Sequence, residues 1–225
     1  MTGGRKVDMV KELYISSTRS LLELKFPPKP KHDYLKTLDT SADEIERFNA
    51  LDMLVQCYRC NTIRNSGWFL SGECDQAIKT ILKYGCDSED MREGIGVMLV
   101  KEGVQSEKVH DFDSAFKFYE ASLKFGIYNP EFRYLRLKNI AFCLCLKGRF
   151  DSAEEFIRGA VALEPERYGG WKNLGIVLEH QGKFQEAADC YRKAIDCSRG
   201  EQRCVRHYKR LLARQPTLRN TCPPL

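Results

Sequence analysis

Apolar residues in the second half of the chain fall three or four positions apart, which is the spacing of one face of an α-helix. In residues 168–201 this pattern runs twice, with Gly182 between the two runs. The two apolar sets are Trp171, Leu174 and Leu178, then Phe184, Ala187, Tyr191 and Ala194. A residue without Cβ can adopt positive φ and end a helix. The pattern therefore predicts two amphipathic helices joined by a tight turn.

The same two-helix pattern occurs three times in succession. Residues 134–167 and 168–201 align without a gap at a shift of 34, and a third copy begins near Gly96 at a shift of 38. The tetrapeptide that starts at Phe112 returns at Phe150. Lys138, Asn139, Gly148, Phe150, Ala153 and Ala160 recur as Lys172, Asn173, Gly182, Phe184, Ala187 and Ala194. One helical hairpin cannot cover its own apolar face, so the copies are expected to stack into a superhelix with a concave inner wall.

This repeat resembles the tetratricopeptide repeat, a helix–turn–helix unit of 34 residues. The last copy matches the family pattern best, at Trp171, Leu174, Gly175, Leu178, Ala187, Tyr191 and Ala194. The other copies depart from it: Leu137 stands where the family favours Trp, Ala141 where it favours Gly, and Ser122 where it favours Ala. The resemblance implies an all-α fold, an α-α superhelix, with three repeats over residues 96–201.

The segments upstream of the repeats are also expected to be mostly helical. Residues 1–40 are expected to hold an N-terminal helix over about 7–24, followed by a linker that the prolines from Pro27 to Pro30 interrupt. In residues 41–95, Ser41 and Glu44 have the spacing of a capping box before a helix that runs to about Cys60. A second helix begins near Cys74, and the pair is a candidate degenerate fourth repeat.

Residues 202–225 are expected to form a basic capping helix and a tail. Cys204, Val205, Tyr208, Leu211 and Leu212 form an apolar stripe, and Arg203, Arg206, Arg210 and Arg214 lie on the opposite face. A solenoid needs such a cap to cover its last apolar face. Residues 199–225 hold seven basic side chains against Glu201 alone, so they contribute +6 to a net charge of +5 and leave −1 for the rest. The basic face is either a solvated surface or a docking surface for an acidic partner or a nucleic acid.

The family resemblance assigns the inner wall chiefly to positions on the first helix of each repeat. These positions hold Val100 and Val104 in the first copy, Lys138, Asn139 and Phe142 in the second, and Lys172, Asn173 and Ile176 in the third. An Asn side chain can pair with a peptide backbone, and Lys favours carboxylates or phosphate. A peptide with apolar and acidic residues would complement this wall. The alternative is that both Asn residues are ordinary repeat consensus on an unoccupied face.

Some members of the family bind the C-terminal carboxylate of heat-shock chaperones through Lys, Asn and Arg residues on the inner wall. Here Val100, Val104 and Gly169 occupy places that this function requires to be polar, and Asn139 alone fits the pattern. We therefore do not expect that particular activity. Glu179 and His180, at the end of a repeat helix, are expected to face the groove.

The sequence offers little for catalysis or metal binding. Its histidines (His32, His110, His180 and His207) are isolated, and it has no glycine-rich phosphate loop. Cys57 and Cys60, with Cys74 and Cys86, could be zinc ligands, but the second pair is too widely spaced for a convincing site. We expect no enzyme activity, no metal and no cofactor.

The segment from Ile140 to Leu146 is the longest apolar run, far short of the roughly 20 residues that a membrane span needs. With ten cysteines and no apolar leader at the N-terminus, the chain is expected to be cytoplasmic with reduced thiols. The predicted function is a non-catalytic adaptor, or a small chaperone, that binds a peptide segment in the groove. The alternative is binding of nucleic acid or an anionic surface through the four arginines, which salt would weaken steeply.

Overall fold

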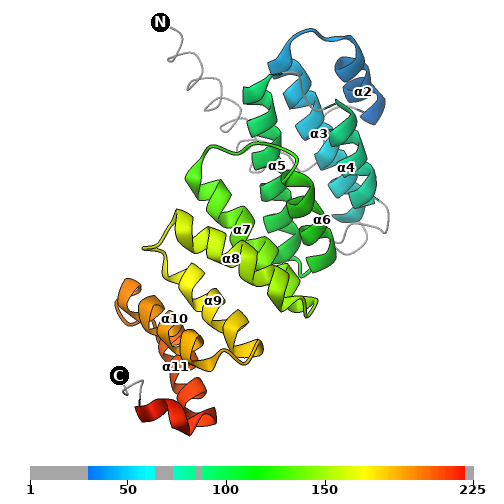
Figure 1. Ribbon diagram of the computed structural model, residues 1–225. Coiled ribbons are helices and arrows are strands. Elements are labelled where there is room, and N and C mark those ends of the chain that lie inside the picture. The colour runs from blue at the N-terminus through cyan, green and yellow to red at the C-terminus, as the bar shows by residue number, and fades with distance from the viewer. Residues whose placement is uncertain (1–29, 64–72, 85–87, 221–225) are drawn as a thin grey trace, which may run out of the picture. The chain divides into compact units, whose positions relative to one another are not determined.

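The computed structural model describes residues 30–63, 73–84 and 88–220, and α-helices account for most of them (Figure 1). The helices are α2 (Lys31–Thr40), α3 (Glu44–Ile63), α4 (Glu73–Tyr84), α5 (Glu89–Lys108), α6 (Phe112–Ser122), α7 (Pro130–Leu146), α8 (Phe150–Leu163), α9 (Tyr168–His180), α10 (Phe184–Cys197) and α11 (Gln202–Arg214), followed by the 3₁₀ helix η1 (Pro216–Asn220). No β-strand occurs in these ranges. The predicted all-α fold is confirmed. The helix expected over 7–24 lies outside the described residues.

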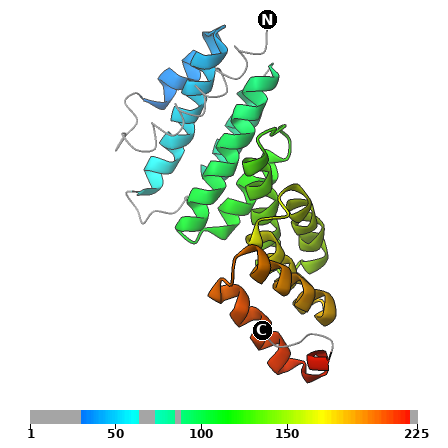
Figure 2. The ribbon, with the colours of Figure 1, turned by 90° about the vertical axis from the view of Figure 1, so that its left-hand side faces the viewer.

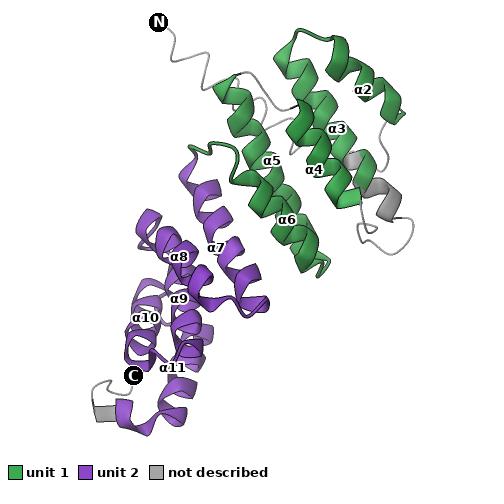
Figure 3. Cartoon of the chain, turned by 45° about the vertical axis from the view of Figure 1, so that its right-hand side comes forward, with its two compact units in different colours: residues 1–128 green, residues 129–225 purple. Residues whose placement is uncertain are grey.

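The chain divides into two compact units, residues 1–128 and residues 129–225 (Figure 3). In the first unit α5 packs against α6, and α3 packs against α2, α4 and α5, as Figure 2 shows from the side. In the second unit α7 pairs with α8, α9 with α10, and α11 packs on α10. The first of the three predicted repeats therefore lies in the first unit, and the other two lie in the second unit.

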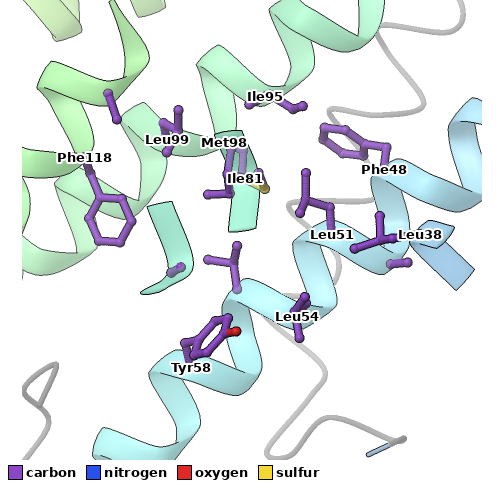
Figure 4. Packing of buried hydrophobic residues seen from close by; sticks show 14 of the residues in the cluster. Leu38, Phe48, Leu51, Leu54, Tyr58, Ile81, Ile95, Met98, Leu99 and Phe118 are labelled. Atoms are coloured by element: carbon purple, nitrogen blue, oxygen red, sulfur yellow. The ribbon is translucent and has the colours of Figure 1, made fainter. Parts of the chain in front are cut away.

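An apolar cluster fills the space between the helices of the first unit (Figure 4). It includes Leu38, Phe48, Leu51, Leu54, Tyr58, Ile81, Ile95, Met98, Leu99 and Phe118. Phe48, Leu51 and Leu54 recur at helical spacing on α3 and are buried, so one face of this helix packs into the core over residues 48–58. Burial of each large side chain stabilises the fold by roughly 1.5–3 kcal/mol relative to exposure. Residues from 31–40, where the sequence suggested a linker, also contribute to this core.

Helix α2 was not foreseen from the sequence, which had suggested a linker before residue 41. The helix begins immediately after Pro30, whose φ is −62°. Tyr34 and Leu38 lie one turn apart and are both buried in the cluster. This spacing is that of one helix face. Two apolar residues among ten are too few to predict a helix from the sequence alone.

The expected capping box at Ser41 is not formed. Asp43, not Ser41, caps α3: one of its carboxylate oxygens accepts hydrogen bonds from the backbone N–H groups of Ile45 (2.8 Å) and Glu46 (3.0 Å). The Ser41 hydroxyl instead donates to the Glu46 carboxylate at 2.6 Å. Both residues can serve as N-caps. Asp43 stands directly before Glu44, the first residue of the helix, and its negative charge favours the helix N-terminus.

Repeat helices approach closely where a glycine faces a tyrosine ring. A Cβ atom on Gly175 in α9 would lie 2.6 Å from the Tyr191 ring of α10, and one on Gly103 in α5 would overlap the Tyr119 ring of α6. Both tyrosines are fully buried. The indole of Trp171 is half-exposed and donates a hydrogen bond to the Pro165 carbonyl at 2.7 Å.

The turn between the helices of a repeat uses one residue with positive φ. Gly148 (φ 71°) and Gly182 (φ 77°) occupy this place in the second and third copies, as predicted. In the first copy the same place is held by His110 (φ 61°). An L-residue in this region pays a steric cost of about 1 kcal/mol that glycine avoids.

Helix α11 packs on α10 in the second unit. Cys204, Tyr208, Leu211 and Leu212 are buried. The carboxylate of Glu179, at the end of α9, accepts hydrogen bonds from the Tyr191 hydroxyl (2.9 Å) and from the guanidinium groups of Arg210 (3.3 Å) and Arg214 (3.5 Å). Its side chain is only 11% exposed. Glu179 is therefore a junction between α9, α10 and α11 instead of a contact for a partner.

We predict that His110→Gly stabilises the protein. The substitution relieves the cost of positive φ, partly offset by the greater freedom of glycine in the unfolded chain, for a net gain of about 0.5 kcal/mol. Gly148→Ala is the matched control and should lower the free energy of unfolding by about 1 kcal/mol, since no atom obstructs its Cβ and backbone strain alone acts. Urea unfolding followed by circular dichroism measures both. A loss of stability in His110→Gly would contradict the analysis.

We also predict that Glu179→Ala destabilises the second unit by about 2 kcal/mol. It leaves the buried Tyr191 hydroxyl without its acceptor and removes the anchor of Arg210 and Arg214. Glu186→Ala, which removes an exposed partner of Arg158, should change stability by less than about 0.5 kcal/mol. Urea unfolding gives the free energies, and amide hydrogen exchange should show loss of protection in α11 for Glu179→Ala alone. Equal effects of the two substitutions would show that the junction is unimportant.

Candidate functional site

The second unit has a series of three recesses along α7, α9 and α11. The first, here called the apolar recess, has a volume of about 260 Å³. It is lined by Ala141, Phe142, Cys145, Leu146, Phe150, Asn173, Ile176, Val177 and His180. His180 stacks on Phe150 with ring centroids 4.5 Å apart and an interplanar angle of 6°. Phe142 is 38% exposed, so the recess offers an aromatic surface to a ligand.

The second recess, here called the mixed recess, shares Asn173 with the first. Its volume is about 410 Å³, and its lining is Tyr134, Lys138, Glu166, Arg167, Tyr168, Gly169, Lys172, Asn173 and Arg203. Tyr134 is buried, and the Arg167 guanidinium lies 4.9 Å from the centre of its ring. The Tyr134 hydroxyl is neutral near neutral pH and can donate a hydrogen bond, and burial raises its pKa further above its ordinary value.

The third recess, here called the basic recess, shares Lys172 and Arg203 with the second. Its volume is about 570 Å³, and it is lined by Lys172, Arg203, Arg206, His207 and Arg210. Burial lowers the pKa of Lys172, and the neighbouring Arg203 adds to this effect. The pKa of His207 is also lowered, first by burial and then by Arg210 and Lys172. Both shifts are due mainly to burial, and the neighbouring cations add to them.

Five of the eight residues expected on the inner wall line these recesses. They are Lys138, Phe142, Lys172, Asn173 and Ile176. Asn139 is only 4% exposed and is part of no recess described above. Val100 is fully buried in α5 and Val104 is half-buried there, so both belong to the first unit. The structure thus brings together the expected residues of the second and third copies, apart from Asn139.

The four arginines of the expected basic face separate into two groups. Arg203, Arg206 and Arg210 line the basic recess together with Lys172 of α9. Arg214 is not part of this lining, and its guanidinium reaches Glu179. The sequence placed these arginines on the outer side of a cap, but it could not show that this side turns toward the repeat helix that carries Lys172.

Sequence reasoning missed Tyr134, Phe150 and His207 as lining residues. Tyr134 lies one turn before Lys138 on the same helix face, and that spacing was the available signal. Phe150 belongs to a second helix of a repeat, which the family resemblance assigns to the outer layer. His180, expected only to face the groove, lines the apolar recess through its stack on Phe150.

The described part of the candidate zinc site consists of two buried cysteines. Cys57 and Cys74 are buried, and burial raises the pKa of Cys74 to about 12. The side chain of Cys60 and the whole of Cys86 lie outside the described residues. Among described residues, no group of three His, Cys, Asp or Glu side chains is arranged to hold a metal ion. In those same ranges, no helix is both long and apolar enough to cross a membrane.

Comparison with known proteins identifies the repeat. The sequence profile of the tetratricopeptide repeat matches residues 169–199. The chain is 30% identical over 109 residues to the photosystem I assembly protein Ycf3 of Prochlorococcus marinus (strain MIT 9211), a match that covers 42% of this chain and 62% of that relative. The chain thus spans about three fifths of the length of this relative.

Two solved structures share the fold at low sequence identity. The tetratricopeptide-repeat-containing domain of a putative FK506-binding protein from Plasmodium falciparum superposes with a TM-score of 0.54 and 14% identity, covering 60% of this chain and 97% of that one. YrrB, described as a tetratricopeptide repeat protein with an unusual peptide-binding site, gives a TM-score of 0.53 and 16% identity, covering 92% and 94%. Residues 169–199 thus match the tetratricopeptide repeat, and these two similarities show that the chain has the fold of tetratricopeptide repeat proteins.

Proposed function

We propose that the chain is a non-catalytic adaptor that binds a polypeptide segment along the three recesses of its second unit. The observation that carries this proposal is their continuity. Asn173 belongs to the apolar and the mixed recess, and Lys172 and Arg203 belong to the mixed and the basic recess. A ligand that follows this surface meets an apolar site, then hydrogen-bonding groups, then positive charge.

The chemistry of the surface suits a peptide chain. Phe142 and Ile176 can bury an apolar side chain, with a gain of about 25 cal/mol for each Å² of apolar surface removed from water. The Asn173 amide carries both a donor and an acceptor and can pair with a peptide backbone. Apart from Glu166 and Arg167, which lie in the loop before α9, the lining residues come from helices, so most of the surface is preorganised and a bound peptide need not order it.

The buried positions set limits on the binding surface. Asn139 and Val100 have almost no exposed surface, and we therefore leave them out of the proposed contact. Val104 is half-buried and remains a candidate contact for a ligand of the first unit alone.

The names of the similar proteins are consistent with a role in holding other polypeptides. One relative is named as an assembly protein, and YrrB is described as having a peptide-binding site. A chaperone-like adaptor, which holds a segment of an assembling protein, is the specialised form of the proposal. A cytoplasmic location remains a prediction from the sequence.

The test is selection of peptides from a random display library on the full chain. We expect the wild-type protein to enrich peptides with a common apolar position, and the double variant Phe142→Ala/Asn173→Ala to lose at least about tenfold in affinity for them. Affinities are measured by fluorescence anisotropy with synthetic peptides. The helical circular dichroism should be unchanged, since both side chains project from an intact helix surface.

The matched control is Leu123→Ala/Gln185→Ala, which removes an exposed apolar side chain and an exposed amide outside the recesses. This variant should bind the selected peptides like the wild type. Equal binding by the wild type and by Phe142→Ala/Asn173→Ala would remove the apolar recess from the account.

A further inference from the structure

We infer that the basic recess binds an anionic group, a carboxylate or a phosphate, on the same peptide segment whose apolar side chain occupies the apolar recess. This inference rests on the proposed function and specifies the chemistry of the ligand. The sequence predicts α11 as a cap that covers the last apolar face. In this inference α11 also forms one wall of the proposed binding surface.

Cationic side chains dominate the lining of the basic recess. Lys172 from α9 and Arg203, Arg206 and Arg210 from α11 line one cavity, and no carboxylate is among its lining residues. Two acidic groups that act on its lining residues are already engaged: Glu201 pairs with Arg203 at 3.0 Å, and Glu179 pairs with Arg210 and Arg214. Neither Lys172 nor Arg206 forms an ion pair with any carboxylate in the described ranges.

The packing of α11 holds these cations together. Cys204 and Tyr208 are buried on the opposite face of α11, and the Glu179 junction fixes its C-terminal half. The arginines therefore cannot move far from Lys172 without uncovering the apolar face. Holding these like charges beside the half-buried Lys172 costs free energy through their mutual repulsion. A bound anion offsets that cost, and guanidinium groups present paired donors that match a carboxylate or a phosphate.

The distribution of charge along the recesses favours a peptide over a nucleic acid as the ligand. A nucleic acid chain carries a negative charge at each phosphate, and its binding sites carry positive charge along the backbone path. Here positive charge lines the basic recess and, beside Glu166, the mixed recess, whereas the apolar recess at the other end of the series is lined by Phe142, Ile176 and Val177. A ligand that is apolar at one position and anionic at another fits both ends, and a peptide has that character.

The helix register gives the spacing between the two positions on the ligand. Lys172 lies four residues before Ile176 and eight before His180, which corresponds to about 6–12 Å along α9. An extended peptide advances about 3.3 Å per residue. The acidic residue is therefore expected about two to four positions from the apolar residue.

The experiment repeats the peptide selection on three forms of the full chain. These are the wild type, Lys172→Gln/Arg206→Gln, and the control Arg192→Gln/Lys209→Gln, which loses the same charge at exposed positions outside the recess. The wild type and the control should enrich peptides with an acidic residue two to four positions from an apolar one. The Lys172→Gln/Arg206→Gln variant should still enrich the apolar residue and lose the acidic preference.

Synthetic versions of one selected peptide identify the source of the anion. They carry Glu, phosphoserine or Gln at the acidic position, and a single-stranded DNA 20-mer serves as the polyanion. For the wild type, Glu or phosphoserine should bind at least about tenfold more tightly than Gln, and this difference should vanish in Lys172→Gln/Arg206→Gln. Whichever of the Glu and phosphoserine peptides binds more tightly identifies the anionic group that the basic recess prefers.

The outcomes separate the two proposals. Enrichment of apolar peptides without an acidic preference overturns this inference and leaves the proposed function intact, whereas no enrichment on the wild type overturns both. An acidic preference that survives in Lys172→Gln/Arg206→Gln assigns the anion to other residues and also overturns the inference. DNA binding that exceeds peptide binding and is lost in this variant would assign the recess to nucleic acid.

Discussion

The contact between Gly175 and the Tyr191 ring is the constraint on which the second unit depends. Because Gly175 lacks a Cβ, α9 and α10 can approach until the ring lies against the backbone of α9. At this depth the Tyr191 hydroxyl reaches the carboxylate of Glu179, one turn further along α9. That carboxylate in turn holds Arg210 and Arg214 of α11. Helix packing inside one repeat thus determines where the terminal helix lies.

This arrangement links the core to the proposed binding surface. Residues around Gly175 on α9 (Lys172, Asn173 and Ile176) line the three recesses, so the helix that is fixed by the Tyr191 contact also presents the ligand-facing side chains. The Glu179 junction then adds the arginines of α11 to the basic end. Stability and recognition share the same helix, and a change at Glu179 would alter both. The first unit has the equivalent close approach between Gly103 and Tyr119.

The sequence predicted those features that depend on local spacing. Apolar residues at helical intervals predicted the repeat helices, and Gly148 and Gly182 marked turns whose positive φ the structure shows. It failed where two candidates were chemically equivalent, as with Ser41 and Asp43 at the start of α3. It also failed where the signal was short: two apolar residues in α2 have meaning only because the core of the first unit receives them.

The proposed binding surface was harder to predict than the fold, for a geometric reason. A helical wheel shows which face of α11 carries its arginines, but not which neighbour that face meets, and so the association of Arg206 with Lys172 could not be deduced. The same limit applies to Asn139 and Asn173, which occupy equivalent repeat positions. The first is buried and the second is half-exposed between two recesses, because their neighbouring helices differ.

The most direct test of the account is photo-crosslinking of a selected peptide to the full chain. A photoreactive phenylalanine analogue is placed at Ile176, at Arg206 or, as a control, at the exposed Arg192 of α10. If the peptide binds along the recesses, we expect its apolar part to crosslink to position 176 and its acidic part to position 206, with no product from position 192. Crosslinks from position 192 alone would show that the peptide binds outside the recesses, and the central claim would be wrong.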